Sequence, residues 1–521
     1  SLTGGGAANV SATFEIPTTG KWYWEYFLYG LTSGGVIGIA DGSAMKGTAL
    51  GDWTKIYGYS PNGNKYENGS GSSYGATLAT GDLVGVKYDA DTRQLEFFKN
   101  NVSQGVAYTV SSDYNYYPSI HGNAIDVTAN FGQKPFRYAP PAGYQPLNAA
   151  NVRPETVITR PDQYVDVSTW TVPSGNANTT IVTPFKPDLV MAKNRSGTDG
   201  GSIYNSVSGD TKFMRIFDSE TNANDAEATA ATRFNFNNNG FTFEADNDNA
   251  NYGAGDNSVA WSWKAGGGKS GGGGFFKDDV EYGSANAAGL TSGSITAASV
   301  GTKQGFSIIH YSGGGGSSVS HGLSQTPGFF FIACRNVTNG NYYDAWHSGY
   351  YVSGSKNYMR LTTAGNAGYA SDMFGTPTSS VVTLGGSSSM NGSNNYTLYC
   401  WHDVPGLQKF GKYSGSGNND GTFVELGFRP TLVWVKSDST AGQEWIVYDS
   451  KRTPNNAINK YLIIETNASD STGREIDFLS NGFKLRNGAS GATDFSGRTY
   501  IYCAWAEAPV SNLYGGQSNA R

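Results

Sequence analysis

The chain contains 521 residues, of which 13% are aromatic, 15% are charged and 71 are glycine. Its net charge of −6, with no basic run, argues against nucleic acid and anionic membranes as partners. Three cysteines do not make a disulfide framework, because the count is odd and small for this length. The length predicts three or four domains. An aromatic, glycine-rich composition without sustained helical periodicity predicts an all-β protein.

The first 150 residues contain short aromatic and β-branched runs separated by turn residues. Such runs recur every ten to twenty residues or so, which predicts an antiparallel sandwich. The expected strands lie within 12–16, 20–26, 36–40, 57–59, 81–89, 95–101 and 130–136.

This succession resembles the SPRY domain, a concanavalin-like β-sandwich. The resemblance covers roughly the first 145 residues and rests on five segments and one dipeptide, namely Lys21–Glu25, Val36–Ala40, Gly81–Asp89, Phe97–Asn101, Tyr117-Pro118 and Asn130–Phe136. SPRY domains bind ligands through loops at one edge and carry no catalytic centre. The resemblance therefore implies recognition rather than chemistry.

Beyond residue 155, one kind of apolar strand occurs three times, each time just after a proline. Proline fixes the backbone and donates no hydrogen bond, so it belongs at the start of a strand. A short β-branched and aromatic run bounded by turn residues predicts a buried strand. The prolines, Pro187, Pro327 and Pro430, are spaced 140 and 103 residues apart.

Each copy then continues with a second strand and closes on an alternating aromatic strand. The second strands contain Ile203–Ser206, Ala345–Ser348 and Val447–Ser450. The closing tryptophans, Trp263, Trp401 and Trp505, are spaced 138 and 104 residues apart, nearly the same steps as the prolines. Two landmarks with matching steps indicate an internal repeat of roughly a hundred residues, the size of a bead-like domain.

These landmarks predict four β-sandwich domains of jelly-roll type. An SPRY-like sandwich occupies 1–147, repeat 1 occupies 155–265, repeat 2 with an N-terminal extension occupies 275–404, and repeat 3 occupies 405–510. The glycine-rich stretch Gly266–Gly274 is expected to be a flexible joint.

An SPRY-like domain followed by repeats, with closing strands such as Trp261–Gly267, resembles structural proteins of marine bacteriophages. In these proteins, uncharacterised repeats of this type occur in tail and fibre genes. The resemblance covers nearly the whole chain and implies a virion protein that assembles in the cytoplasm of the bacterial host. It brings no known chemistry with it.

The sequence offers little for a metal site. The five histidines, His121, His310, His321, His347 and His402, show no zinc-ligand spacing. His347 replaces Asn205 and Asp449 at the related repeat position, which favours a turn or surface role. Asn247, Asn249 and Asn251 are spaced like a calcium loop, but Ser258 stands where the bidentate glutamate is needed. We predict no metal and no cofactor.

Motifs for catalysis are also missing. The polyglycine stretches lack the lysine and the helix of a phosphate loop, and no Gly-x-Ser-x-Gly elbow occurs. Carboxylate pairs for sugar hydrolysis need no proximity in sequence, and nothing singles out a pair. The prediction is that the protein is not an enzyme.

The densest aromatic cluster lies in repeat 2. It has two interpretations, a stacking platform for sugars and packing of the core. Packing is favoured because Trp346 aligns with Tyr204 and Tyr448 of the other repeats. The candidate ligand-binding residues are Tyr342, Tyr343, Trp346, Tyr350 and Tyr351.

The function predicted from these observations is that of a phage tail fibre that binds a host-surface glycan or protein receptor. A capsid decoration or head-fibre protein is one alternative, and a polysaccharide-degrading tail spike is another. The expected partners are other virion proteins and further copies of the chain, in a trimer by analogy with phage fibres. Because the chain begins at Ser1 and opens into Gly4–Gly6, residues are expected to precede it.

Overall fold

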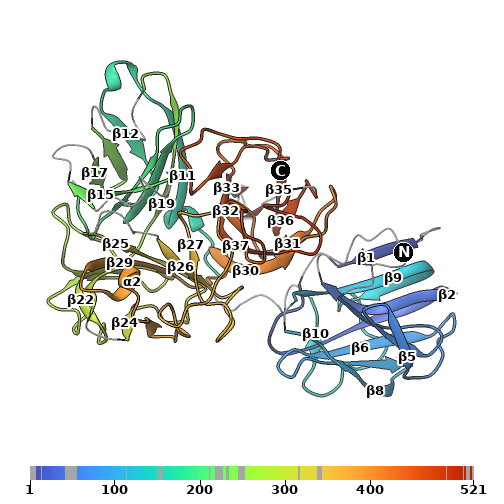
Figure 1. The fold of residues 1–521 in the computed structure, drawn as a ribbon. Coiled ribbons are helices and arrows are strands. Elements are labelled where there is room, and N and C mark those ends of the chain that lie inside the picture. Colours follow the sequence, from blue (N-terminus) through green and yellow to red (C-terminus); the bar gives the residue numbers. More distant parts are fainter. Residues whose placement is uncertain are drawn as a thin grey trace. The chain divides into compact units, whose positions relative to one another are not determined.

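The computed structural model describes residues 7–12, 15–41, 55–112, 114–148, 151, 157–210, 212–217, 227–229, 234–244, 253–314, 317–336, 343–488, 490–508, 510–511 and 517–518. The chain divides into two compact units (Figure 1). The first comprises residues 1–155 and 413–425, and the second comprises residues 156–412 and 426–521.

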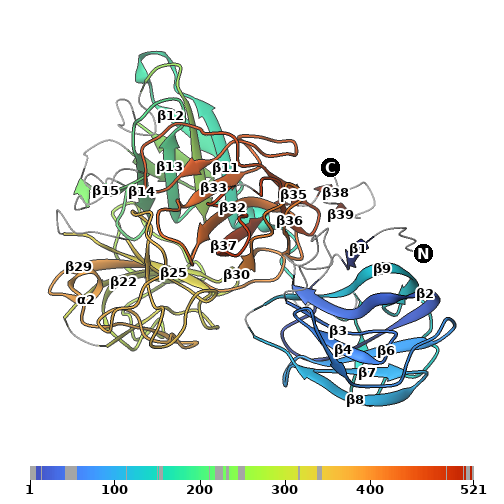
Figure 2. The ribbon, with the colours of Figure 1, turned by 45° about the vertical axis from the view of Figure 1, so that its right-hand side comes forward.

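The first unit is a sandwich built on one long strand, β2 (Lys21–Asp41). Its sheet follows the order β5-β4-β3-β2-β6-β7-β8, and β9 pairs with both β1 and β2 (Figure 2). Trp22, Trp24 and Tyr26 alternate along β2 and are at most 4% exposed, so this face of the strand forms the core. The other strands are β1 (Ala7–Ser11), β3 (Ile56–Tyr59), β4 (Asn64–Glu67), β5 (Ser70–Ser73), β6 (Leu83–Asp89), β7 (Gln94–Lys99), β8 (Val102–Thr109), β9 (Tyr116–Asn130) and β10 (Gln145–Pro146).

The second unit contains three sheets with the same central strand order. In each sheet the closing strand lies between the first strand and the proline-led strand. The order is β11-β19-β13-β14-β15 in repeat 1, β23-β29-β25-β26-β27 in repeat 2 and β30-β37-β32-β33-β34 in repeat 3. Repeat 1 extends this sheet with β16, and the extension of repeat 2 adds β20–β22. The shared order shows that the sequence repeat is also a structural repeat.

The strands of repeat 1 are β11 (Val165–Thr171), β12 (Thr179–Val182), β13 (Leu189–Asn194), β14 (Gly201–Asn205), β15 (Lys212–Ile216), β16 (Ala228–Thr229), β17 (Phe234–Asn237), β18 (Gly240–Phe243) and β19 (Asn257–Trp263). Those of repeat 2 are β20 (Phe275–Lys277), β21 (Val280–Tyr282), β22 (Ser294–Gly301), β23 (Phe306–Ser312), β24 (Ser318–Ser320), β25 (Phe329–Cys334), β26 (Asp344–His347), β27 (Met359–Arg360), β28 (Val381–Thr383) and β29 (Asn395–Trp401). Repeat 3 contains β30 (Gln408–Ser414), β31 (Phe423–Glu425), β32 (Pro430–Ser437), β33 (Ile446–Asp449), β34 (Leu462–Ile463), β35 (Ile476–Leu479), β36 (Gly482–Leu485) and β37 (Thr499–Ala506), and β38 (Val510–Ser511) pairs with β39 (Gln517–Ser518) after it.

Apart from Asn151, the helical residues in the described part of the chain lie in α2 (Ser388–Asn391) and two short 3-10 turns, η2 (Pro161–Gln163) and η3 (Ser174–Asn176). No helix in these parts of the chain has the length and hydropathy needed to cross a membrane. Smaller second sheets accompany the large ones, β12-β18-β17 in repeat 1 and β24-β28 in repeat 2. The prediction of an all-β fold of tandem sandwiches is therefore confirmed.

The strand registers align the three repeats residue by residue. The residue two positions after each proline lies opposite the closing tryptophan, and the pairs are Leu189 with Trp263, Phe329 with Trp401 and Leu432 with Trp505. The same residues lie opposite the last residue of the second strand, where the pairs are Leu189 with Asn205, Phe329 with His347 and Leu432 with Asp449. The proline and tryptophan landmarks therefore mark one conserved register within the chain.

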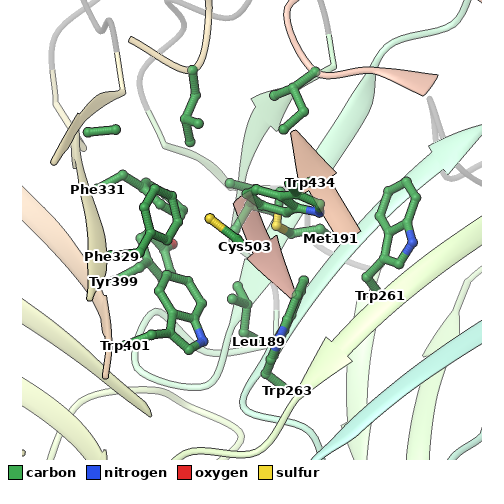
Figure 3. Close-up of a cluster of buried hydrophobic side chains, with 14 of the residues drawn as sticks. Leu189, Met191, Trp261, Trp263, Phe329, Phe331, Tyr399, Trp401, Trp434 and Cys503 are labelled. Atoms are coloured by element: carbon green, nitrogen blue, oxygen red, sulfur yellow. The ribbon is translucent and has the colours of Figure 1, made fainter. Parts of the chain in front are cut away.

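The three repeats share one hydrophobic core. Their closing tryptophans meet there, and the ring centroid of Trp263 lies 6.2 Å from that of Trp401 and 5.4 Å from that of Trp505. Trp401 and Trp505 are themselves 6.2 Å apart. Figure 3 shows side chains of all three repeats around this point. The three repeats are therefore not separate bead-like domains. The predicted boundaries between them in the sequence remain predictions.

The glycine-rich stretch between repeats 1 and 2 is packed against both, in contrast to the expected flexible joint. A side chain at Gly266 would meet the backbone of Val300 at 2.1 Å, and one at Gly272 would meet the carbonyl oxygen of Ser208 at 2.4 Å. Gly266 also donates its N–H to Ser299 Oγ at 2.9 Å. Glycine is needed here for close backbone approach, because any larger residue would separate the neighbouring strands.

Hydrogen bonds close the repeats into a ring around the tryptophans. Asn205 of repeat 1 donates Nδ2–H to the Tyr399 hydroxyl of repeat 2 at 3.0 Å. His347 of repeat 2 donates Nε2–H to the Tyr502 carbonyl of repeat 3 at 3.0 Å. Asp449 of repeat 3 accepts from Trp261 Nε1 of repeat 1 at 3.2 Å. One structural position therefore links each repeat to the next.

The same position also caps the turn that follows it. Asn205 Oδ1 accepts the Ser208 N–H at 2.9 Å, His347 Nδ1 accepts the Gly349 N–H at 2.9 Å, and Asp449 Oδ1 accepts the Arg452 N–H at 2.9 Å. Three different side chains fulfil this role because each offers an acceptor at the required place. The turn role predicted for His347 from its alignment with Asn205 and Asp449 agrees with this geometry.

A pH-dependent effect is expected at His347, where burial lowers the pKa to about 4. The unfolded chain takes up a proton near pH 6.5, whereas the folded chain does so only near pH 4. Stability is therefore full above pH 6.5 and is lost as the pH falls toward 4. Relative to His347→Asn, which copies Asn205, the wild type should lose roughly 3 kcal/mol between pH 7.5 and pH 4.

Urea unfolding of both proteins at these two pH values measures this difference. The other ionisable groups are common to the pair and cancel. A difference between wild type and variant that does not change with pH would show that His347 has the same pKa in the folded and the unfolded chain, which contradicts the effect of burial.

The cysteines are free and buried, as the odd count predicts. Cys400 and Cys503 both lie on closing strands, but they differ by one residue in register, because Cys400 precedes Trp401 directly whereas Cys503 lies two residues before Trp505. Neighbouring residues of a strand face opposite sides. Cys503 accordingly lies in the shared core, and Cys400 lies in a second core within repeat 2.

Candidate functional site

Two members of the aromatic cluster of repeat 2 lie in the protein core, in line with the packing interpretation that the sequence favoured over a ligand platform. Tyr343 and Tyr350 are at most 2% exposed and lie in the core shared by the repeats. Tyr343 donates its hydroxyl to the Arg215 carbonyl at 2.6 Å, across to repeat 1, and Tyr350 donates to the Ala345 carbonyl at 2.6 Å. Tyr342 lies outside the described residues.

Trp346 is also buried, at 3% exposure, and stacks on Phe330 with ring centroids 5.3 Å apart. Its register opposite Phe330 corresponds to that of Tyr204 opposite Val190 and Tyr448 opposite Val433. Buried rings have no free face for a sugar, so the described members of the cluster other than Tyr351 do not form a platform.

Tyr351 is half-buried and lines a hollow of about 270 Å³ on repeat 2. Its hydroxyl lies 2.7 Å from Thr376 Oγ1. Asn357 at the base donates to the carbonyls of Ala370 and Phe374, both at 2.9 Å. These polar groups bond to one another and to the backbone of the surrounding loops, and the exposed ring of Tyr369 also lines the hollow.

A larger hollow, of about 530 Å³, lies on the first unit at the end of its sheet. Its lining residues come from β4, β5, the turn between them and β8, and they are Lys65, Glu67, Asn68, Ser70, Gly71, Ser72 and Tyr108. Lys65 pairs with Ser72 and Glu67 pairs with Ser70 across the two strands. Since alternate residues of a strand share a face, Lys65 and Glu67 both project on the side of the hollow.

The charges of the hollow are held in place by neighbouring groups. Lys65 Nζ donates to the Ala107 carbonyl at 2.6 Å and lies 4.9 Å from the centre of the Tyr108 ring. Burial, and then the Glu67 carboxylate, raise the pKa of Tyr108 well above its usual range. Burial is also the main cause that raises the pKa of Tyr57. The phenols stay neutral at physiological pH, so the hollow offers one cation, one anion and hydroxyl groups for binding.

The β4–β5 hairpin owes its shape to the two residues between its strands. Glu67 pairs with Ser70, so Asn68 and Gly69 form a two-residue turn, with φ of 50° and 81°. Two positive φ values define a type I′ turn, for which Asn-Gly is the preferred sequence. This dipeptide could have located the hairpin from the sequence, but no strand was predicted between residues 60 and 80.

Three charged side chains of the repeats, Lys436, Glu465 and Lys193, are buried. Lys436 is fully buried, hydrogen-bonds to the Gln443 carbonyl, and has its pKa lowered to about 8 by burial. Glu465, 4.0 Å away, has its pKa raised to about 7, again mainly by burial. Lys193 has the same register in repeat 1 and donates to the Asn467 carbonyl of repeat 3 at 2.9 Å. These lysines bind the repeats together and do not face a ligand.

Among the residues that the structure describes, no group of three His, Cys, Asp or Glu side chains is placed to hold a metal ion. Asn247, Asn249 and Asn251, which have the spacing of a calcium loop, lie outside the described residues.

Comparison with known proteins assigns both units. Residues 160–509 match the family described as Domain of unknown function (DUF7483), and residues 21–134 match the SPRY domain family. Among solved structures, the SPRY domain of human HERC1 is similar at 18% identity and a TM-score of 0.22, covering 25% of this chain and 86% of that structure.

Three relatives of known name match this chain over a stretch the size of the SPRY region. The Ran-binding proteins 9/10 homolog of Drosophila melanogaster is 31% identical over 139 residues, or 25% of this chain and 14% of that protein. Ran-binding protein 10 of Danio rerio and Ran-binding protein 9 of Homo sapiens are each 34% identical over 139 residues, or 25% of this chain and 22% and 19% of those proteins. The match thus spans less than a quarter of each relative.

These relatives correct the function predicted from the sequence. They are Ran-binding proteins of animals, not proteins of virions, and this finding overturns the prediction of a phage tail fibre together with its capsid, head-fibre and tail-spike alternatives. The virion location, the virion and host-receptor partners and the trimer drawn from phage fibres were wrong for the same reason. A layout of recognition domain plus repeats describes an architecture and does not specify where it is used.

The SPRY family match confirms the resemblance drawn from the strand order of the first 145 residues. The second match spans all three repeats, including the ring that joins them. With an SPRY domain at its N-terminal side, the chain belongs to the family of the Domain of unknown function DUF7483.

Proposed function

We propose that this protein is a non-enzymatic binding protein whose SPRY domain recognises a segment of another protein. The observation that carries the proposal is the open hollow at the end of the SPRY sheet, where Lys65 and Glu67 stand side by side above small residues. A cation and an anion on one strand suit a polar peptide. The names of the relatives, as Ran-binding proteins, support a protein ligand.

The makeup of the two hollows supports binding rather than catalysis. The lining of the SPRY hollow contains one carboxylate, one ammonium and hydroxyl groups, without a cysteine or histidine to serve as nucleophile or base. The repeat 2 hollow is lined by tyrosine, serine, asparagine, threonine and apolar residues. In this proposal the three repeats form a rigid body that carries the recognition domain.

A random decapeptide library displayed on yeast and sorted on the full-length protein tests this function. We expect enrichment of polar peptides whose binding falls at least fivefold in Lys65→Met/Glu67→Gln, which removes both charges at nearly unchanged volume. The matched control is Lys460→Ala, an exposed lysine of repeat 3, which should leave binding unchanged. The proposal would be contradicted if no peptide is enriched. It would also be contradicted if the enriched peptides bind the double variant as well as they bind the wild type.

A further inference from the structure

The strands at the two ends of the SPRY sheet order, β8 and β5, differ in how they pair with their neighbours. At one end, the pairing of β8 with β7 is interrupted twice by register shifts, on either side of Glu96. Gly105 within β8 has a φ of 83°. Such bulges twist an edge strand and prevent another chain from pairing with it. At the other end, β5 pairs with β4 in unbroken register over all four residues.

The β5 edge also lacks the other usual protections. Its residues, Ser70, Gly71, Ser72 and Ser73, include no charge and no proline, and all four are exposed. Edge strands of soluble proteins are commonly protected by lysine, proline or a bulge. An exposed, regular and uncharged edge is therefore a place where an extended segment can add as a further strand.

The backbone of β5 is oriented for such an addition. The Ser60 N–H donates to the Asn64 carbonyl at 2.9 Å, and the Asn64 N–H donates to Asn62 Oδ1 at 2.9 Å. The backbone N–H and C=O of Asn64 thus both point away from β5. The pair of Asn64 with Ser73 is therefore of the non-hydrogen-bonded kind. In such a pair the N–H and C=O of Ser73 point to the open side of the strand.

The hollow supplies side-chain selectivity next to this backbone. Lys65 and Glu67 of β4 line the hollow together with the small residues Ser70, Gly71 and Ser72 of β5. A Cβ at Gly71 would meet the Tyr66 ring at 2.8 Å, so the strand has little room for a larger residue there. An added strand would place alternate side chains over the hollow, two residues apart like Lys65 and Glu67.

We propose, as a consequence of the function proposed above, that an extended segment of another protein adds to the SPRY sheet along β5. Its acidic residue faces Lys65, and a basic residue two positions away faces Glu67. The main-chain bonds to Ser73 give affinity, and the charge pair fixes the register and direction of the segment.

Two substitutions at Ser73 test the backbone part with peptides enriched from the yeast library. Ser73→Pro removes the outward N–H, and we expect at least a tenfold loss of affinity. Ser73→Ala keeps the N–H and should remain within twofold of wild type. If Ser73→Pro lowers the melting temperature of the protein, Ser72→Lys provides the second test, because it fills the hollow and leaves the backbone intact.

The charge part is tested by repeating the selection on Lys65→Glu/Glu67→Lys. We expect the order of acidic and basic residues in the enriched peptides to be reversed. Peptides that bind but ignore both Ser73→Pro and the charge reversal would overturn strand addition while leaving the protein-binding function intact. Absence of any peptide would overturn both, and a concentration-dependent dimer that Ser73→Pro dissolves would show that the edge serves a second copy instead.

Discussion

Replacing Trp263 with alanine is expected to lower the free energy of unfolding of the entire repeat unit by about 3–5 kcal/mol. Trp263 is 1% exposed, and its ring contacts the closing tryptophans of both other repeats as well as Trp434, 6.3 Å away. The indole fills the place where the three sheets converge (Figure 3). A cavity there cannot collapse easily, because rigid rings from three sheets surround it.

If the repeats share one core, the loss of stability in Trp263→Ala should extend to all three repeats. If each repeat has its own core, the loss should be confined to repeat 1. Amide hydrogen exchange should become faster not only in β19, which carries Trp263, but to a similar extent in β29 and β37. Exchange that accelerates in β19 alone would mean that the repeats fold as independent domains. The control variant Tyr369→Ala removes a ring that is 50% exposed and should change stability by less than about 0.5 kcal/mol.

The strands of the repeats could be predicted because local chemistry determines them. A proline before an apolar run and an alternating aromatic strand at the end are properties of neighbouring residues, and they mark the strands that carry Leu432 and Trp505. The assembly of the repeats could not be predicted in this way. Periodicity shows that Trp263 is buried but not which strands cover it, and a single repeat offers the same pattern to its own sheet and to its neighbours.

The aromatic cluster shows the same limit, because its sequence allowed both a ligand platform and the core packing that was favoured. Tyr343 and Tyr350 look like a binding platform because many aromatic residues lie close together in the sequence, yet the shared core of three repeats needs this many rings. The SPRY hollow, in contrast, is lined by Lys65, Glu67 and serines, whose types are common on any surface. Only the fold brings β4, β5 and β8 together, so the sequence could offer at most the Asn68-Gly69 turn.

The ring between the repeats explains why one position tolerates Asn205, His347 and Asp449. Each caps its own turn and bonds to the following repeat, but only Asp449 brings a charge into the interior. Arg452 neutralises it, with Nε 2.6 Å from Asp449 Oδ2, and neither side chain is exposed. The guanidinium also donates to the Val447 carbonyl at 2.8 Å.

Substitution of Arg452 with methionine is expected to lower the stability of the repeat unit by about 3–5 kcal/mol, because it leaves a buried carboxylate without its cation. Methionine preserves most of the length of the side chain, so loss of packing is small. Asp470, the second partner of Arg452 at 3.0 Å, retains its ion pair with Arg195 at 2.9 Å and is therefore not the main cause. Chemical denaturation in low and high salt should give the same loss, since salt screens buried charges weakly.

The double variant Asp449→Asn/Arg452→Met decides whether the charge or the shape of Arg452 matters. Asparagine already occupies this position in repeat 1 as Asn205, where it caps the turn without an arginine. With no carboxylate left unpaired, the double variant should be at least about 1–2 kcal/mol more stable than Arg452→Met alone. If the double variant is instead less stable than the single one, Asp449 contributes mainly through its bonds to Trp261 and the backbone. The arginine would then mainly stabilise the contact between repeats 3 and 1 rather than neutralise the carboxylate.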